Sequence, residues 1–258
     1  MKKITQSVVL VMTMIILITS CKKNAVPYVP GTPQPTTSVY KLEKDGNLLN
    51  AAYNTDGSLR TINRTVSPNG AIQTYTFSYD NGRLAEVNFG GKWKYIYTGD
   101  LITSVETYLT GGVLKYRTDF TYTNGKVSER TEYLVNSING GTPSYRVLFS
   151  YRNDGNVDKK IMYQYVNGEW KMLEQATYIS YDQFANVSEP FESFPYLPAS
   201  MLSPNNPVKE NWVDDSGILD QTVNHVYTYD INGRPLTRKS IFSYPGFPDW
   251  VSDLKITY

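Results

Sequence analysis

The chain has 258 residues, of which 40% are hydrophobic, 14% aromatic and 19% charged, and its formal net charge is +1. The composition is that of a folded domain, and the near-neutral charge excludes a generally basic nucleic-acid binder, because phosphate binding needs a concentration of Lys and Arg. The strongest bias is the 22 Tyr against one His and one Cys, and such an excess of tyrosine favours half-buried β-sheet. We therefore expect an all-β protein with no nucleic-acid partner.

The first twenty residues predict a cleaved secretory signal. Lysines at positions 2 and 3 precede an apolar run over residues 8–18, and small residues follow before Cys21, which is the arrangement of a signal peptide. The run is shorter than the roughly 20 apolar residues of a transmembrane helix. The order from Ile18 to Cys21 resembles the bacterial lipoprotein signal-peptidase site, which implies that Cys21 becomes the lipidated first residue and holds the mature protein on the membrane.

The residues after Cys21 predict a tether and then one folded domain. Prolines at positions 27, 30, 33 and 35 interrupt residues 22–38. Pro-rich segments extend by about 3.1 Å per residue, so the tether reaches roughly 50 Å. We expect residues 1–20 to be the signal peptide, 21–38 the lipidated Cys and the tether, and 39–258 a single β-repeat domain.

A short pattern recurs along the predicted domain: an aromatic residue, any residue, Tyr, a turn with Asn, Asp or Gly, and then an aliphatic residue. Its clearest copies are residues 77–84, 120–127 and 227–236. Around the first copy Tyr75, Phe77 and Tyr79 alternate with small hydroxyl residues, which is the period of two of a half-buried strand. The Asn-Gly pair at 81–82 then predicts a tight hairpin turn.

Further Asn-Gly, Asp-Gly and Gly-Gly pairs follow about one strand length apart. This spacing leaves no room for crossover helices, so neighbouring strands are antiparallel and sequential. A sheet of more than about ten strands usually curls or folds over. We predict an all-β fold, a long antiparallel meander of repeated hairpins that forms one curled sheet, an open barrel or a clamshell, and the sequence leaves these three forms open.

The repeats carry a resemblance to a known family. Residues 79–84, Tyr-Asp-Asn-Gly-Arg-Leu, and residues 229–236 resemble the tyrosine-aspartate (YD) repeats of RHS-type proteins, and the whole chain resembles the uncharacterised repeat-bearing lipoproteins of Bacteroidota. The resemblance implies a hairpin architecture and a lipoprotein of unknown function. It carries no toxin or protease activity, because the RHS shell uses many more repeats to enclose its cargo.

The same resemblance bears on the location of the protein. Surface lipoproteins of Bacteroidota resemble one another in an acidic cluster directly after the lipidated Cys. Here Lys22 and Lys23 follow Cys21, and the first acidic residue is Glu43. We expect lipid anchoring in the outer membrane, with the periplasmic face favoured over the cell surface.

Residues 188–223 interrupt the rhythm of the repeats. Prolines at 190, 195, 198, 204 and 207 argue against a central strand, and long irregular segments in compact domains are usually functional or cover an open core. We predict an irregular insertion that packs as a plug or edge cover. Any contact with a partner is expected there, with Phe194, Tyr196 and Trp212 as the candidate binding side chains.

The sequence offers little catalytic chemistry. Without a second His or a free Cys, His225 cannot belong to a transition-metal cluster, and a nucleophilic triad would have to use this single His. We predict a structural role for His225, and we predict no catalytic residue, metal or cofactor.

Two functions remain open. The first is a non-catalytic binding or scaffold module whose aromatic faces contact a glycan or an envelope protein; the four Trp residues, 93, 170, 212 and 250, suit either sugar stacking or a core. The alternative is a polysaccharide hydrolase that uses a carboxylate pair near the insertion, because glycoside hydrolysis needs two carboxylates. The candidate carboxylates for it are Glu210, Asp214, Asp215 and Asp220. The sequence sets no oligomeric state.

Overall fold

The computed structural model describes residues 38–66, 70–135, 141–187, 191 and 203–258. Within these residues sixteen strands follow in chain order, and each is hydrogen-bonded to its neighbours in sequence. The predicted signal peptide, Cys21 and the tether up to residue 37 lie outside the described residues. The strands are β1 Lys41–Lys44, β2 Asn47–Tyr53, β3 Leu59–Val66, β4 Ala71–Asp80, β5 Arg83–Asn88, β6 Lys92–Thr98, β7 Leu101–Tyr108, β8 Leu114–Thr123, β9 Lys126–Leu134, β10 Thr142–Tyr151, β11 Val157–Val166, β12 Glu169–Ala185, β13 Asn205–Asp214, β14 Leu219–Tyr229, β15 Pro235–Ser243 and β16 Trp250–Thr257.

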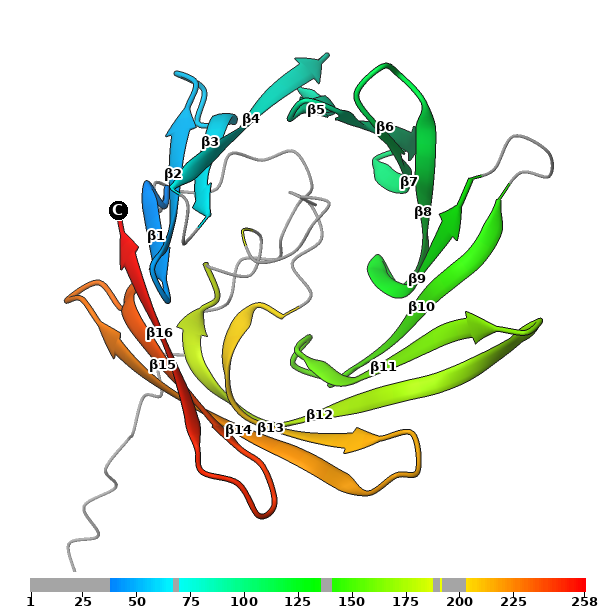
Figure 1. Cartoon of the computed structure of the whole chain (residues 1–258). Coiled ribbons are helices and arrows are strands. Elements are labelled where there is room, and N and C mark those ends of the chain that lie inside the picture. Colours follow the sequence, from blue (N-terminus) through cyan, green and yellow to red (C-terminus); the bar gives the residue numbers. More distant parts are fainter. Residues whose placement is uncertain (1–37, 67–69, 136–140, 188–190, 192–202) are drawn as a thin grey trace, which may run out of the picture.

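The sheet closes on itself. Strand β1 pairs antiparallel with β16, with Lys41 opposite Thr257, and also with β2, so the strands form the ring shown in Figure 1. The predicted all-β antiparallel meander is confirmed. Of the forms that the sequence left open the protein adopts a barrel, and the barrel is closed rather than open, because the first and last strands satisfy each other's edges.

The predicted hairpin turns are confirmed where two consecutive residues take positive φ. Asn81 and Gly82 have φ of 49° and 76°, the conformation that gives a two-residue turn the same twist as its strands. The same pair of positive angles occurs at 45–46, 124–125 and 167–168. The local turn chemistry therefore sets the positions at which the meander reverses.

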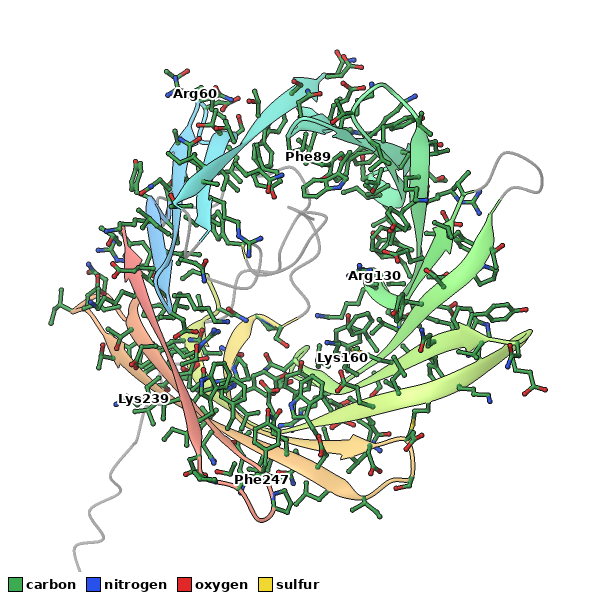
Figure 2. The ribbon with its side chains drawn as sticks, viewed as in Figure 1. Arg60, Phe89, Arg130, Lys160, Lys239 and Phe247 are labelled. Carbon is green, nitrogen blue, oxygen red and sulfur yellow. The ribbon has the colours of Figure 1, made fainter. Side chains whose placement is uncertain are left out.

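The two faces of the barrel wall differ in polarity. In β4, Tyr75 and Phe77 are buried, while the alternating residues Thr74, Thr76 and Ser78 are exposed. Figure 2 shows Phe89, Arg130 and Lys160 on the inner side of the wall and Arg60 and Lys239 on its outer side. In β4 the aromatic side chains therefore face the interior and the hydroxyl side chains face outward, whereas elsewhere charged residues occur on both faces and aromatic residues such as Phe247 and Trp250 are exposed.

The interior has two parts. An apolar core of side chains from β1–β9 and β16 fills one side, and Phe191, from between β12 and β13, is buried in it. The side enclosed by β9–β15 is instead lined by a mixture of charged and aromatic side chains. The first part supplies the hydrophobic stabilisation of the barrel, and the second contains the candidate site.

Seven tyrosine hydroxyls join neighbouring hairpins at one end of the barrel. Between β9 and β10 the backbone ladder ends at the pair Glu129–Leu148, and beyond this pair the Tyr151 hydroxyl donates to the carbonyl of Val127 at 2.7 Å. A side-chain hydroxyl thus takes over where backbone pairing stops, and it satisfies a carbonyl of a buried residue. We call this set the tyrosine belt: Tyr53, Tyr97, Tyr122, Tyr151, Tyr181, Tyr227 and Tyr258, which donate to the carbonyls of Val39, Leu84, Ile102, Val127, Val157, Pro207 and Pro235 at 2.7–3.1 Å.

Basic residues of the turns hold several rings of the tyrosine belt from one side. Lys126 precedes Val127, whose carbonyl accepts the hydrogen bond from Tyr151, and its Nζ lies 4.9 Å from the centre of the Tyr151 ring. Arg234, next to Pro235, lies 4.5 Å from the ring of Tyr258. Such cation–π contacts contribute about 0.5–1 kcal/mol at exposed sites. The basic residue and the aliphatic residue that end the sequence repeat therefore bind the same tyrosine of the next hairpin.

The predicted irregular insertion is shorter than expected. Strand β13 and the start of β14 lie inside residues 188–223, so the expectation that irregular structure continues to Val223 is wrong. Pro207 is accommodated because it lies opposite Tyr181, at a point where the register between β12 and β13 shifts, and irregular pairing is one of the positions that tolerate proline.

Removing one hydroxyl from the tyrosine belt tests its contribution. Tyr151→Phe should lower the free energy of unfolding by about 1 kcal/mol, because the Val127 carbonyl loses its partner. For a chain of this size that corresponds to a fall in Tm of about 2–4 °C. Tyr40→Phe is the control, since Tyr40 is 52% exposed and not in the belt. Equal melting of the two variants would contradict the structural role of the belt.

The buried tyrosines also predict sensitivity to alkali. Burial raises the pKa of Tyr79 to about 12, and donation to Glu106 raises the pKa of Tyr108 to about 12. In the unfolded chain tyrosine ionises near pH 10. The stabilisation is therefore complete below about pH 10 and declines as the pH rises towards about 12, because the unfolded state releases protons first. The urea midpoint should fall over this interval, and a flat midpoint would argue against buried hydroxyls.

Candidate binding cavity

The charged side of the barrel interior encloses a cavity of about 760 Å³, within the range typical of small-molecule sites. Strands β9–β15 supply most of its described lining, and β1 contributes one lysine. Aromatic side chains of β10, β11, β12, β13 and β15 lie among the polar ones. The charged residues of the described lining are Lys44, Arg130, Arg146, Lys160 and Arg238, with the acidic residues Glu132 and Glu210.

Aromatic rings hold two of these cations. The Arg146 guanidinium lies 5.0 Å from the ring centre of Tyr163 and 4.8 Å from that of Trp170. The Lys160 ammonium lies 5.3 Å from the ring centre of Trp212. These ring contacts help to keep each cation in a defined place, since the face of an aromatic ring attracts a positive charge.

Burial makes the cationic lining costly. It lowers the pKa of Arg130, and the neighbouring Glu132 carboxylate partly opposes this effect. The Nε–H of Arg146 is buried and has no hydrogen-bond partner among the described residues. Since a buried donor without a partner costs free energy, the lining has capacity to bind an acceptor.

A chain of side-chain hydrogen bonds connects the three neighbouring strands β13, β14 and β15. Trp212 Nε1 donates to Glu210 Oε2 at 3.0 Å, Glu210 Oε1 lies 3.0 Å from His225 Nε2, and His225 Nδ1 lies 2.8 Å from the Ser240 hydroxyl. The strand register makes this possible, because His225 and Ser240 are direct cross-strand partners. Every link satisfies a buried polar group.

This chain contains a Ser, a His and a Glu, but its geometry differs from that of a nucleophilic triad. In the triad the serine contacts Nε2 of the imidazole and the acid contacts Nδ1, whereas here Ser240 faces Nδ1 and Glu210 faces Nε2. Ser240 is also only 2% exposed. The geometry therefore supports the structural role predicted for His225.

The structure describes only some of the residues predicted to bind a partner or to act in hydrolysis. Trp212 lines the cavity, whereas Phe194 and Tyr196 lie outside the described residues. Glu210 lies in the cavity wall, but Asp214 accepts hydrogen bonds from the turn residues Ser216 and Ile218, and Asp215 and Asp220 are exposed. The four carboxylates considered for hydrolysis are thus not gathered at one place.

Sequence reasoning missed the basic lining. The cavity lining includes every second residue of one part of β15, namely Arg238, Ser240 and Phe242. A basic residue at the same alternation as inward-facing residues could therefore have predicted a charged interior. Elsewhere the aromatic candidates divide between faces: Trp93 belongs to the apolar core, and Trp250 is 53% exposed.

Two further properties concern only the described part of the chain. It contains no helix long and apolar enough to cross a membrane. It also contains no group of three or more His, Cys, Asp or Glu residues arranged to hold a metal ion.

Comparison with solved structures identifies similar barrels. A porin-like protein from Bacteroides uniformis ATCC 8492 is 17% identical, with a TM-score of 0.59 over 88% of this chain and 99% of that one. A porin-like protein from Bacteroides vulgatus ATCC 8482 is 13% identical, with a TM-score of 0.50 over 86% of this chain and 99% of that one. No family model and no curated protein matches the chain. The likeness lies in the fold, an antiparallel barrel.

Proposed function

We propose that this chain is a non-catalytic binding barrel of the bacterial cell envelope, anchored by lipid on Cys21, which holds a glycan in the cavity enclosed by β9–β15. The observation that carries the binding role is the cavity itself, with a volume of about 760 Å³ and a lining of aromatic and charged side chains. Concave sites with aromatic walls and a few placed polar groups are typical of ligand binding.

The polarity of the barrel supports lipid anchoring over insertion of the strands into a membrane. Transmembrane barrels present an apolar band outward and a polar interior. Here the alternating outward residues of β16 are Val251, Asp253, Lys255 and Thr257, of which three are polar or charged, and the inward residues include Leu254 and Ile256. A lipid on Cys21 would supply the attachment that this outer face does not provide.

The similar structures support an envelope location for the proposal. Both proteins come from Bacteroides and are described as porin-like. That description applies to those two proteins, and we use only their source and their fold in this proposal. Because polar and charged residues are exposed on the outer faces of β4 and β16, we place the barrel beside the outer membrane, on the periplasmic side that Lys22 and Lys23 favour. The resemblance to RHS-type repeats concerns only the hairpin architecture, and it implies no enzymatic activity for this proposal.

Replacing Cys21 tests the anchor. In the expressing bacterium, wild-type protein should incorporate an alkyne-tagged palmitate and Cys21→Ser should not, because the lipid is attached at this residue. Protease added to intact cells should leave the wild type undegraded if it faces the periplasm. Labelling of Cys21→Ser would contradict the anchor, and digestion in intact cells would contradict the periplasmic face.

Replacing Trp212 tests the cavity. The fluorescently labelled mature chain should be retained by a subset of glycans on an array of neutral and acidic oligosaccharides. Trp212→Ala should weaken that binding at least about tenfold, since a few aromatic anchors usually dominate recognition. Trp250→Ala, on an exposed residue, is the matched control, and thermal melting verifies that both variants are folded. Retention of no glycan, or equal retention of both variants, would contradict the proposed function.

A further inference from the structure

The hairpin turn between β15 and β16 exposes an aromatic side chain at its tip. Phe247 is 74% exposed, and Figure 2 shows it on this turn at the outer margin of the barrel. Tyr244 and Trp250, on either side of it in the sequence, are exposed as well. Grouped apolar side chains on the surface of a soluble protein, unlike single ones, can mark an interaction site.

The backbone holds this aromatic side chain in place before any partner binds. The Phe247 amide donates to the carbonyl of Tyr244 at 3.2 Å, and Gly246 between them has a φ of 80°. Pro245 followed by a glycine with positive φ is the signature of a type II turn. Pro248 comes directly after the turn. Because two prolines and a hydrogen-bonded turn restrict the chain, presenting the ring to a partner costs little conformational entropy.

Trp250 is supported from the inner side of the wall. It lies opposite Phe242 in the β15–β16 ladder, with 4.5 Å between the ring centres, and Phe242 lines the cavity. The indole is thus held on one side by a ring while it remains exposed on the other. Aromatic side chains that are fixed in this way are the usual anchors of a protein interface.

The neighbouring turn adds aliphatic side chains at the same end of the barrel. The β14–β15 ladder ends with Thr222 opposite Ser243, so the β13–β14 turn and the β15–β16 turn both lie at this end, which is opposite the tyrosine belt. We define the rim patch as the exposed side chains of Ile218, Leu219, Tyr244, Phe247 and Trp250.

Aspartates border the rim patch. Residues 214–221 and 244–250 contain four Asp and no Lys or Arg, and Asp215, Asp220 and Asp249 are exposed. An anionic membrane surface, or the same patch on a second copy of the chain, would bring negative charge against these aspartates, and like charges brought together disfavour association. A basic partner is attracted by the same aspartates.

The described chain begins at the other end of the barrel. Strand β16 runs from Trp250, in the rim patch, to Thr257, which lies opposite Lys41 at the start of β1. The residues before Ser38, among them Cys21, therefore join the barrel at the end that carries the tyrosine belt. An anchor on Cys21 attaches the barrel at the end that lies away from the rim patch.

We propose that the rim patch docks a protein partner whose surface has an apolar pocket bordered by lysine or arginine, and that Phe247 enters this pocket. The proposal concerns a surface outside the cavity, so it goes beyond the proposed glycan binding and does not depend on it. The turn supplies a fixed aromatic anchor, and the aspartates select a partner with a basic border.

Photo-cross-linking in the expressing bacterium identifies the occupant of the rim patch. The photoreactive amino acid p-benzoylphenylalanine is placed at position 247 and, in a second variant, at position 231. Ile231 is the control because it is 99% exposed on the β14–β15 turn, at the opposite end of the barrel. The probe at 247 should form an adduct with one protein, at a peptide that contains Lys or Arg beside apolar residues, and the probe at 231 should not capture that protein.

Binding of the captured protein after purification completes the test. Phe247→Ser should weaken its binding at least about tenfold, and the double variant Asp215→Lys/Asp249→Lys should weaken it as well, because the charge that attracts the partner is reversed. Ile231→Ser removes an exposed apolar side chain from the opposite end and should bind as the wild type does. Thermal melting verifies that all variants are folded.

Several outcomes would overturn the proposal. An adduct of the 247 probe with phospholipid assigns the rim patch to a membrane, and an adduct with a second copy of this chain assigns it to self-association. No adduct, or an adduct at an acidic peptide, removes the basic partner. Equal binding of Phe247→Ser and Ile231→Ser, or tighter binding of the Asp215→Lys/Asp249→Lys variant, contradicts the proposed contact directly. None of these outcomes bears on glycan binding in the cavity.

Discussion

The hydrogen bond from a tyrosine hydroxyl to a carbonyl of the preceding hairpin is the contact on which the closed barrel depends. At this end of the barrel the backbone ladders between hairpins stop short: the β15–β16 ladder ends at Thr237–Lys255, and Tyr258 continues it by donating to Pro235. Without the hydroxyl, the carbonyl of the adjacent hairpin would lose its partner at this end, at a cost of about 1 kcal/mol. A carbonyl removed from water needs a partner, and the tyrosine belt supplies one at seven junctions between hairpins.

The tyrosine belt also contributes to the closure of the barrel between β1 and β16. Tyr53 donates to Val39, just before the first strand, and Tyr258 follows the last strand. The first and last strands therefore meet as the two arms of one more hairpin that lacks only its turn. Closure reuses the contact that joins the other hairpins, and it removes the two edges that an open meander would expose to aggregation.

The sequence predicted those parts of the structure that local chemistry decides. Asn81 and Gly82 specify their turn through backbone angles, and the alternation around Tyr75 specifies the buried face. Closure depends instead on pairing between Lys41 and Thr257, which results from the accumulated twist and curvature of all strands. The alternation of side chains along a strand likewise could not predict which residues line the cavity. The registers of β10 and β11 shift at Ser150–Tyr151 and Met162–Tyr163, and each shift changes which side chains face inward.

The division of the interior explains how a barrel with charged inner residues stays folded. Residues such as Ile62, Val87 and Val105, at most 1% exposed, bury apolar surface on one side, and each fully buried side chain of this kind contributes about 1.5–3 kcal/mol. Like charges enclosed together cost several kcal/mol per ion when nothing neutralises them. Filling the remaining space with apolar side chains would be more stable for the barrel alone. Arg146 and Lys160 occupy it instead, each held against aromatic rings, so cation–π contacts offset part of the cost of placing charged groups inside the barrel.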